Sequence, residues 1–381
     1  MNNGQQPWRT PSAAYLHIPF CAHHCGYCDF AVATGQDHQI DLYLEALEVE
    51  MATLGRPASV KTIFLGGGTP TYLSPKQLER LLMDIRRWLP LEAGGEFSIE
   101  STPESITPEK MDVIASFGVT RVSIGVQSFQ SHLLPVLDRI HGPDHVAPAV
   151  EAVRKHGMSL SLDLIFGVPG QSLDDWRCDL DRALQFQPDH LSTYGLTYEK
   201  GTPLWKQRER GRVIALDEDA ELDLYLLTMD HLAAAGFEHY EISNFARQGR
   251  RCRHNEVYWA NHAYHGFGVG AARYVDAKRE INVRALNDYL RRVLAGETPT
   301  FQSEELEPEE RARETAVIQL RRSDGIDRAA FRIQTGFDLD DLNGPKIAFH
   351  ASSGLLDDDG QRVALTRRGK CVADALVTDL L

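Results

Sequence analysis

Short apolar segments alternate with amphipathic helices over the first 200 residues, and this alternation limits the fold more than any other feature of the chain. The apolar runs have the length of strands, and the segments between them repeat apolar residues at helical spacing. Six consecutive strand–helix units predict a parallel sheet with right-handed crossovers. The predicted strands are Ala13–Ile18, Thr62–Leu65, Phe97–Glu100, Arg121–Val126, Leu160–Phe166 and His190–Leu196. The predicted helices are Asp37–Leu54, Pro75–Trp88, Pro108–Phe117, Val146–His156 and Leu173–Phe186.

A closed or partly closed barrel is the expected form of this sheet, and we assign it to residues 12–216 after a polar tail at residues 1–11. In such barrels the functional residues lie at the C-terminal ends of the strands. Residues 217–303 form an extension that begins with a predicted helix, Asp217–Ala235, and continues with a segment rich in His, Tyr and Gly. We therefore expect the site near the carboxyl edge of the first sheet.

The tail, residues 304–381, predicts a small separate α+β domain of winged-helix type. Its acidic start, Glu304–Glu310, is expected to be a solvated linker or the start of a helix. An Asp-rich turn precedes a short strand at residues 363–365. The predicted helices of this domain are Arg311–Leu320, Asp327–Thr335 and Gly369–Leu380.

Composition narrows the class of protein. The formal charge of −14 argues against a broad nucleic-acid-binding face. No apolar run has the length of a membrane span, and the polar first eleven residues lack a signal-peptide core, so we expect a cytoplasmic protein. Six cysteines in 381 residues do not make a disulfide scaffold. Three of them crowd into eight residues, which predicts a metal site.

This cluster is Cys21, Cys25 and Cys28, spaced C-x3-C-x2-C directly after the first predicted strand. Thiolates bind iron–sulfur clusters. Three cysteines can hold three irons of a four-iron cube and leave the fourth iron open to amino and carboxylate groups. The alternative is structural zinc, which usually takes four protein ligands. His23, His24 or Asp29 could supply a fourth, although the chain has no second cysteine pair.

Polar residues end or interrupt several of the predicted strands. Three glycines, Gly66–Gly68, follow the second strand, where they allow a ligand to approach the backbone. Glu100 and Gln127 end the third and fourth strands, and Asp163 lies within the fifth. A carboxylate buried in a strand is costly unless it is paired. Because these residues stand at successive strands, they predict one polar pocket.

The stretch from Tyr15 to Phe30 resembles the radical S-adenosylmethionine (SAM) enzymes, in the branch that contains the coproporphyrinogen dehydrogenase HemN and its relative HemW. The resemblance covers nearly the whole chain and implies a partial (β/α)6 radical SAM barrel with a [4Fe–4S] cluster on Cys21, Cys25 and Cys28. One departure is Ser101-Thr102-Pro103, where HemW-like chains often have Ala-Asn-Pro. The SAM contacts implied by the resemblance are Tyr15, Tyr27, Gly67, Gly68, Thr69, Glu100, Gln127, Arg139 and Asp163.

Within this branch, three features resemble HemW more than the dehydrogenase. Phe30 stands where the dehydrogenase has a fourth cysteine, and only 20 residues precede Cys21. The third feature is an H-N-x-x-Y-W motif, which resembles the haem-binding motif of HemW and consists of His254, Asn255, Tyr258 and Trp259. A neutral imidazole is a common axial haem ligand, so His254 is the expected ligand. His262, His265 and Cys252 are secondary candidates.

The expected function is that of a haem chaperone, which binds haem as cargo and delivers it to respiratory or other haem-accepting apoproteins. The alternative is oxygen-independent coproporphyrinogen III dehydrogenase in porphyrin biosynthesis. If SAM is turned over, a one-electron donor is also a partner. No nucleic-acid partner is expected, whereas peripheral contact with a membrane-bound recipient and formation of a homodimer are compatible with these expectations.

Overall fold

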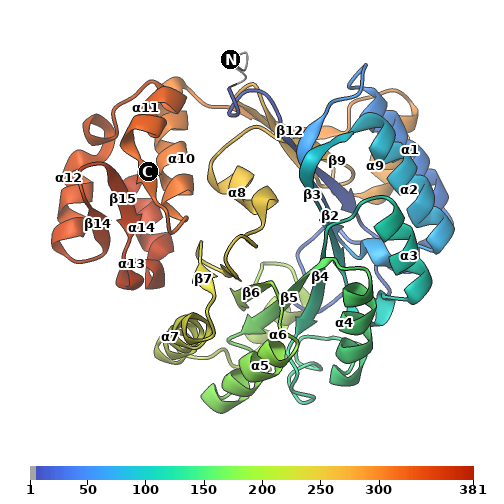
Figure 1. Cartoon of the computed structure of the whole chain (residues 1–381), viewed down its shortest axis with the longest axis horizontal. Helices are drawn as coiled ribbons and strands as arrows, with labels where there is room; N and C mark the ends of the chain where they lie inside the picture. The colour runs from blue at the N-terminus through green and yellow to red at the C-terminus, as the bar shows by residue number, and fades with distance from the viewer. Residues whose placement is uncertain (1–5) are drawn as a thin grey trace.

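The computed structural model describes residues 6–381, and its main feature is a curved parallel sheet with helices on its outer face (Figure 1). The first six strands pair in parallel in the order of the sequence, which confirms the predicted parallel sheet. Residues 1–5 of the predicted polar tail lie outside the described residues. The six strands are β1 (Ala13–Ile18), β2 (Val60–Gly67), β3 (Leu91–Ser101), β4 (Arg121–Gln127), β5 (Ser159–Phe166) and β6 (His190–Gly195).

Helices cover the outer face of this sheet and enclose the largest apolar core. Strand residues such as Ile63, Ile99 and Leu162 point outward into it, since alternate side chains of a strand face opposite sides. Among residues 6–381, none of the helices combines the length and the apolar character that crossing a bilayer requires. The helices of this layer are α1 (Ile40–Ala52), α2 (Pro75–Trp88), α3 (Pro108–Ser116), α4 (Val146–Lys155) and α5 (Leu173–Gln185), with single 3-10 turns at Asp37–Gln39, Pro70–Tyr72, Pro103–Ser105 and Pro143–His145.

The barrel is open, because β1 and β6 pair with other strands and not with each other. The full order of the sheet is β7-β8-β6-β5-β4-β3-β2-β1-β9. β8 (Asn244–Ala246) pairs with β6 antiparallel and with β7 (Glu238–His239), whereas β9 (His265–Phe267) extends the other edge in parallel with β1. Strands from the predicted extension therefore complete the sheet at both edges.

The extension also contains the helix that carries the H-N-x-x-Y-W motif. Asp217 caps the predicted helix by accepting a hydrogen bond from the backbone N–H of Ala220, so this helix is confirmed with bounds one residue inside the prediction. The last strand of a second, three-stranded antiparallel sheet includes Glu304 and Glu305, which were expected in a linker or helix start. The remaining elements of this part are α6 (Pro203–Glu209), α7 (Glu218–Ala234), α8 (Arg253–Trp259), β10 (Ala272–Val275), β11 (Lys278–Asn282), α9 (Leu286–Leu294) and β12 (Thr300–Glu305).

The C-terminal domain is α+β, as predicted, with its own apolar core around Phe331 and a small antiparallel sheet in the order β13-β15-β14. The sequence did not predict α12, which contains Pro345 inside the helix. The predicted last helix is divided at Val372 into α13 and α14. The elements are α10 (Pro308–Leu320), β13 (Ile326–Asp327), α11 (Arg328–Thr335), α12 (Leu339–Ser352), β14 (Leu356–Asp358), β15 (Arg362–Leu365), α13 (Arg367–Cys371) and α14 (Ala373–Leu380).

Candidate functional site

The inner face of the sheet is polar, although a parallel sheet covered on both faces normally carries apolar residues. Outward positions of β4 and β5 hold Val122, Ile124 and Leu162, while the positions between them hold Ser123 and Asp163. This alternation of apolar outward and polar inward residues continues in β6. A polar interior enclosed by the sheet is typical of a ligand chamber rather than a packed core.

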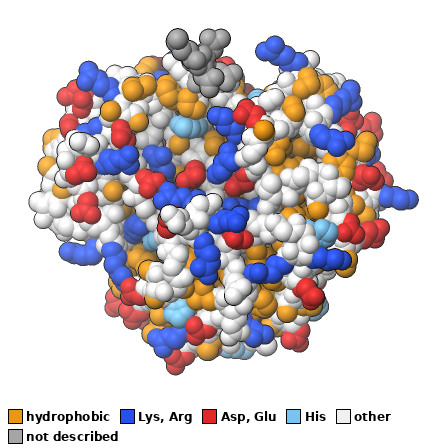
Figure 2. All heavy atoms as spheres, in the orientation of Figure 1, with side chains coloured by type: hydrophobic (Ala, Val, Ile, Leu, Met, Phe, Trp, Pro, Cys, Tyr) orange, Lys and Arg blue, Asp and Glu red, His pale blue; other side chains and the backbone are white. Residues whose placement is uncertain are grey.

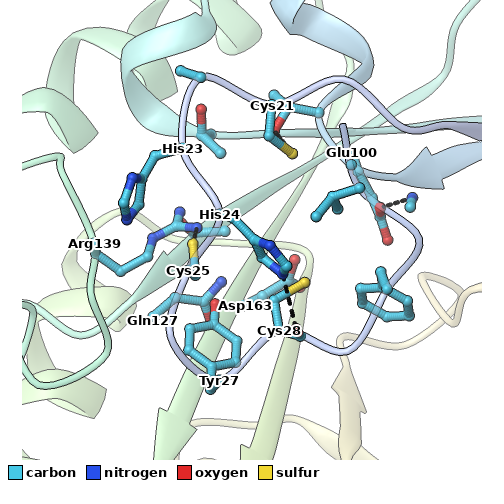
Figure 3. A pocket seen from close by; sticks show the side chains of 18 of the residues that line it. Cys21, His23, His24, Cys25, Tyr27, Cys28, Glu100, Gln127, Arg139 and Asp163 are labelled. Carbon is cyan, nitrogen blue, oxygen red and sulfur yellow. Dashed lines mark hydrogen bonds between the residues drawn. The ribbon is translucent and has the colours of Figure 1, made fainter. Parts of the chain in front are cut away.

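Two adjoining cavities occupy this interior. The first, of about 840 Å³, contains all three cysteines of the motif in its lining, and we call it the cluster cavity (Figure 3). The second, of about 660 Å³, lies against α8 and the inner ends of β4, β5 and β6, and we call it the inner cavity. The two cavities share six lining residues, which are Asp29, Phe30, Gly67, Glu100, Asp163 and Tyr194.

The cysteines lie in the loop that follows β1, and neighbouring polar groups hold two of them. Cys21 Sγ is 3.4 Å from Thr69 Oγ1, and Arg139 Nη1 donates to Cys25 Sγ over 3.2 Å. Burial raises the pKa of the Cys21 and Cys28 thiols to about 11. Among residues 6–381, no three His, Cys, Asp or Glu side chains converge as a single metal ion would require. The three thiols all line the cluster cavity.

The glycines that end β2 and follow it let three strands approach one another. Gly67 has φ +102°, and a Cβ there would lie 2.2 Å from the ring of His17. At Gly68 a Cβ would lie 2.6 Å from the carbonyl oxygen of Ile18. The Gly67 N–H donates to Glu100 Oε2 over 2.8 Å, which fixes this carboxyl at the border of the two cavities. Gly67 and Gly68 line the cluster cavity, so their backbone is open to it.

Acidic groups at this border are held in a poorly solvated setting. Burial raises the pKa of Glu100 to about 7, against the hydrogen bond from Gly67, and raises that of Asp163 to about 6. Ser123 Oγ donates to Asp163 over 2.9 Å. Such a carboxyl group has already lost its solvation in the folded protein. Binding a cationic partner therefore costs it little further desolvation. The pair is suited to accept hydrogen bonds from an ammonium group.

Arg139 brings a positive charge to the opposite side of the cluster cavity. Its Nη2 donates to the carbonyl oxygen of Gly125 over 2.6 Å, while its buried Nε has no hydrogen-bond partner within residues 6–381. A cation, buried carboxyl groups, exposed glycine backbone and three thiols in one cavity form a donor set that fits an iron–sulfur cluster together with an amino acid ligand.

Eight of the nine residues predicted to contact SAM line the cluster cavity, namely Tyr27, Gly67, Gly68, Thr69, Glu100, Gln127, Arg139 and Asp163. The ninth, Tyr15, lines the inner cavity, where its hydroxyl is 3.0 Å from His17 Nδ1. Tyr15 alternates with outward-facing Leu16 in β1 and so lies deeper in the barrel than the cysteine loop.

All four residues of the H-N-x-x-Y-W motif lie on α8 and line the inner cavity. His254 is 1% exposed, and its two ring nitrogens are hydrogen-bonded to Thr62 Oγ1 at 2.9 Å and Tyr258 Oη at 2.8 Å. Its ring stacks on Phe64 at 5.3 Å. Burial lowers the pKa of His254 to about 3, so the imidazole is neutral at pH 7, as an axial ligand must be. Metal coordination through Nε2 would require the Tyr258 hydrogen bond to open.

The secondary ligand candidates lie less favourably. Cys252 lines the inner cavity, but its Sγ is directed at Glu96 Oε1, 3.6 Å away, and burial raises the pKa of its thiol. His262 and His265 line neither of the two cavities. Of the four candidate axial ligands, His254 is the one whose ring nitrogen and position best suit a haem held in the inner cavity.

Sequence reasoning missed several residues of the chamber. Tyr194, near the end of β6, lines both cavities, and the lining of the inner cavity includes Arg121, Ser161 and His190. The signal was present in the strands themselves. Polar residues recur at alternate positions of β4, β5 and β6, interrupted by Gly125 and Ile165, where a buried parallel strand would be apolar throughout.

Comparison with known proteins identifies the architecture. Residues 15–183 match the family model of the radical SAM superfamily, and residues 306–372 match that of the HemN C-terminal domain. The structure of coproporphyrinogen III oxidase (HemN) from Escherichia coli, described as a radical SAM enzyme, superposes with a TM-score of 0.86 at 25% identity. This superposition covers 98% of this chain and 91% of the HemN chain.

Sequence relatives cover almost the full chain. The heme chaperone HemW of Bacillus subtilis is 37% identical over 368 residues, which are 95% of this chain and 97% of the relative. The heme chaperone HemW of Mycobacterium tuberculosis is 38% identical over 380 residues, which are 97% of this chain and 95% of the relative. These matches and the HemN-like structure confirm the resemblance seen in the sequence: the chain belongs to the HemW family of the radical SAM superfamily.

Proposed function

We propose that this protein is a haem chaperone that binds a [4Fe–4S] cluster, SAM and haem, and transfers the haem to apoproteins in the cytoplasm. The observation that carries the proposal is the adjacency of two cavities, one with three thiols and one with the H-N-x-x-Y-W motif. The relatives named heme chaperone HemW support the cargo and the transfer.

In this proposal Cys21, Cys25 and Cys28 hold the cluster. The raised pKa of Cys21 and Cys28 means that these thiols are protonated before they bind iron and release protons as they do. Thr69 Oγ1 lies within hydrogen-bonding distance of the Cys21 sulfur and would donate to its thiolate. When bound, the cluster supplies an open iron for the amino and carboxylate groups of SAM and one electron for its sulfonium.

The chain's own groups would orient SAM beside that iron. Glu100 and Asp163 accept from the cationic amino group, and Arg139 pairs with the carboxylate, for which its unpaired Nε is available. Gly67, Gly68 and Thr69 offer backbone groups to the ligand. Tyr27 and Gln127 complete the wall of the same cavity.

Haem would lie in the inner cavity, with His254 as axial ligand and with Asn255, Tyr258 and Trp259 beside it. Tyr258 and Trp259 supply aromatic surface for a porphyrin face. Since His254 Nε2 is bonded to Tyr258, haem entry exchanges a hydrogen bond for an Fe–N bond and moves the Tyr258 hydroxyl away. His254 is thus protected in the haem-free protein and available once that bond opens.

The second candidate function is coproporphyrinogen III dehydrogenase, favoured by the structural match to HemN over 98% of this chain. Phe30, which stands in place of a fourth cysteine and is 64% exposed, supports the chaperone instead. The deciding experiment uses anaerobically reconstituted protein. We expect saturable binding of haem in a titration followed at the Soret band, with and without the cluster, and no protoporphyrinogen from coproporphyrinogen III, SAM and reductant. Product formation without haem binding would reverse the assignment.

A further inference from the structure

At the end far from the cysteines, the barrel interior contains buried polar atoms without partners. Ser98, Arg121 and Ser159 form one row across β3, β4 and β5, since Ser98 is the register partner of Arg121 and Arg121 that of Ser159. Ser98 Oγ, Arg121 Nε and Nη1, and Ser159 Oγ are all buried and make no hydrogen bond to any residue from 6 to 381. We call these three residues the floor row. Leaving such atoms unsatisfied is costly. Of the three residues, Arg121 lines the inner cavity, whereas Ser98 and Ser159 line neither of the two cavities, so it is Arg121 that can meet a ligand.

Arg121 is the centre of the floor row and lines the inner cavity. One of its three guanidinium nitrogens, Nη2, holds it in place through Glu96 Oε2 at 3.4 Å and the carbonyl oxygens of Arg250 and Arg251 at 2.9 and 3.1 Å. The other two nitrogens remain available. The side chain is 6% exposed, so bulk water does not satisfy them.

The charge of Arg121 is only partly balanced. Glu96 is its ion-pair partner, but the Glu96 carboxylate also accepts hydrogen bonds from the backbone N–H groups of Arg253 and His254 at 3.2 and 3.1 Å. These donors start α8 and draw the negative charge toward the helix N-terminus. A guanidinium with two unpaired N–H-bearing nitrogens is therefore suited to an anion.

The other charged side chains that line the inner cavity are paired or stand at its border, so they do not form part of this anion site. Arg279 is bound to Glu314, and Arg284 to Asp29, on the side of the extension. The acidic groups Glu100 and Asp163 stand at the border with the cluster cavity. Among the charged side chains that line the inner cavity within residues 6–381, Arg121 is the one whose guanidinium Nε and Nη1 are both buried and without a hydrogen-bond partner.

We propose that Arg121 binds a carboxylate group of the molecule held in the inner cavity. A guanidinium binds a planar carboxylate through paired hydrogen bonds. The inference rests on the proposed function for the identity of that molecule: for haem, the group is a propionate. Glu96 joins the floor row to α8, so the propionate site and the His254 ligand would stand on one connected assembly.

The test compares ligands with and without free carboxylates on the full-length, cluster-loaded protein. Haem and haem dimethyl ester are titrated against the wild type and R121Q. A charge-assisted hydrogen-bond pair in a buried site predicts that the wild type prefers the free acid by at least about tenfold. In R121Q both ligands should bind alike. No preference in the wild type, or an undiminished preference in R121Q, would overturn the proposal.

Two further variants separate ligand recognition from folding. E96Q/R121Q replaces the buried ion pair with a neutral amide pair and should likewise lose the preference. S98A removes a buried hydroxyl next to Arg121 in the strand register that lines neither cavity, keeps the ion pair and should leave the preference as in the wild type. S116A, at the exposed end of α3, is the matched serine control and should also behave as the wild type. A preference unchanged in E96Q/R121Q, or lost in S98A, contradicts the proposal.

Two iron-free probes distinguish failure of this inference from failure of the proposed function. Coproporphyrin III and its tetramethyl ester report on carboxylate recognition by fluorescence without any axial ligand, and sodium propionate as competitor tests whether a small carboxylate suffices. Arg121-dependent binding of these probes without haem binding would retain Arg121 as a carboxylate site and remove the haem chaperone. Haem binding without any Arg121-dependent carboxylate effect would do the reverse.

Discussion

At the residue scale, burial sets the protonation of the groups that would meet SAM and haem. Glu100 and Asp163 are acids whose pKa is raised, and His254 is a base whose pKa is lowered, in each case mainly because the charged form is poorly solvated. All three line a cavity, where a bound ligand can change whether the charged or the neutral form is favoured. Their ionisation should therefore respond to ligand binding more than that of surface groups.

Glu100 predicts a pH dependence of SAM binding. Its pKa is near 7, so the carboxylate that accepts the SAM amino group is lost as the pH falls through 7. We expect the SAM affinity of the cluster-loaded protein to fall by up to about tenfold between pH 8 and pH 6. This is the largest change that protonation of a single group with a pKa near 7 can cause over that range. E100Q should bind weakly with a flatter profile. Equilibrium dialysis measures both, and a wild-type profile as flat as that of E100Q would contradict the assignment.

Tyr258 predicts the energetics of haem entry. Y258F removes the hydroxyl bonded to His254 Nε2, so haem no longer has to displace it. A net hydrogen bond of about 1 kcal/mol corresponds to roughly fivefold tighter haem binding in Y258F. H254A should lose the Soret signature of imidazole ligation. Weaker haem binding in Y258F than in the wild type would mean that the hydroxyl acts on haem and not as a cover of His254.

At the scale of elements, α8 is held by a residue from a strand more than 150 positions earlier. Glu96 on β3 accepts from the first backbone N–H groups of α8 and pairs with Arg121 on β4. Within the sheet, strand register likewise brings Asp163 on β5 and Arg121 on β4 to the same interior of the barrel. The H-N-x-x-Y-W motif is thus positioned from the barrel and not by its own loop.

Removal of this connection should destabilise the protein strongly. E96A leaves Arg121 buried without its partner, for which we expect the free energy of unfolding to fall by about 3–5 kcal/mol. E96Q keeps an acceptor for one backbone N–H and should lose less. Urea unfolding followed by circular dichroism measures the difference, with E92A, at an exposed position of β3, as control. Equal stability of E96A and E92A would refute this role of Glu96.

At the scale of the whole molecule, the C-terminal domain rests on the extension through polar contacts. Arg251 pairs with Asp324 at 2.7 Å, Arg367 with Asp230, and Asn261 donates to Thr315 over 2.9 Å. Figure 2 shows Lys and Arg interspersed with Asp and Glu over one face of the molecule. Such contacts hold two separate cores together while permitting relative motion.

Lys370 gives this interface a measurable pH dependence. Its Nζ, which donates to Ser323 Oγ over 2.7 Å and lies 3.3 Å from His239 Nδ1, has its pKa lowered by burial to about 8. The unfolded chain keeps the ordinary lysine pKa near 10.4, so it binds more protons between pH 8 and that value. This group alone should therefore raise stability as the pH rises through that window and oppose folding below it.

We expect K370M to lack this rise, which is about 3 kcal/mol for the full shift and about 2 kcal/mol between pH 8 and pH 10. The measurement is the difference in the free energy of unfolding between pH 8 and pH 10, with the exposed K76M as control. The same pH response in K370M and in the wild type would show that Lys370 is already solvated in the folded protein.

The sequence by itself determined the parallel sheet, the cysteine loop, the glycines after β2 and the polar strand ends. These features depend on neighbouring residues: strand and helix periodicity is local, and C-x3-C-x2-C fixes three thiols within one short loop. The same holds for α7 and for the separate C-terminal core. Eight of nine predicted SAM residues therefore share one cavity with the cysteines.

Only the tertiary structure decided what lies deeper in the barrel. The open edges are completed by β8 and β9, Tyr15 faces the inner cavity, and His254 is bonded to Thr62, 192 residues away. The floor row exists because the register of three strands aligns Ser98, Arg121 and Ser159. Such contacts arise from the packing of distant segments, whose partners no local pattern specifies, and so they emerge only when the chain is folded.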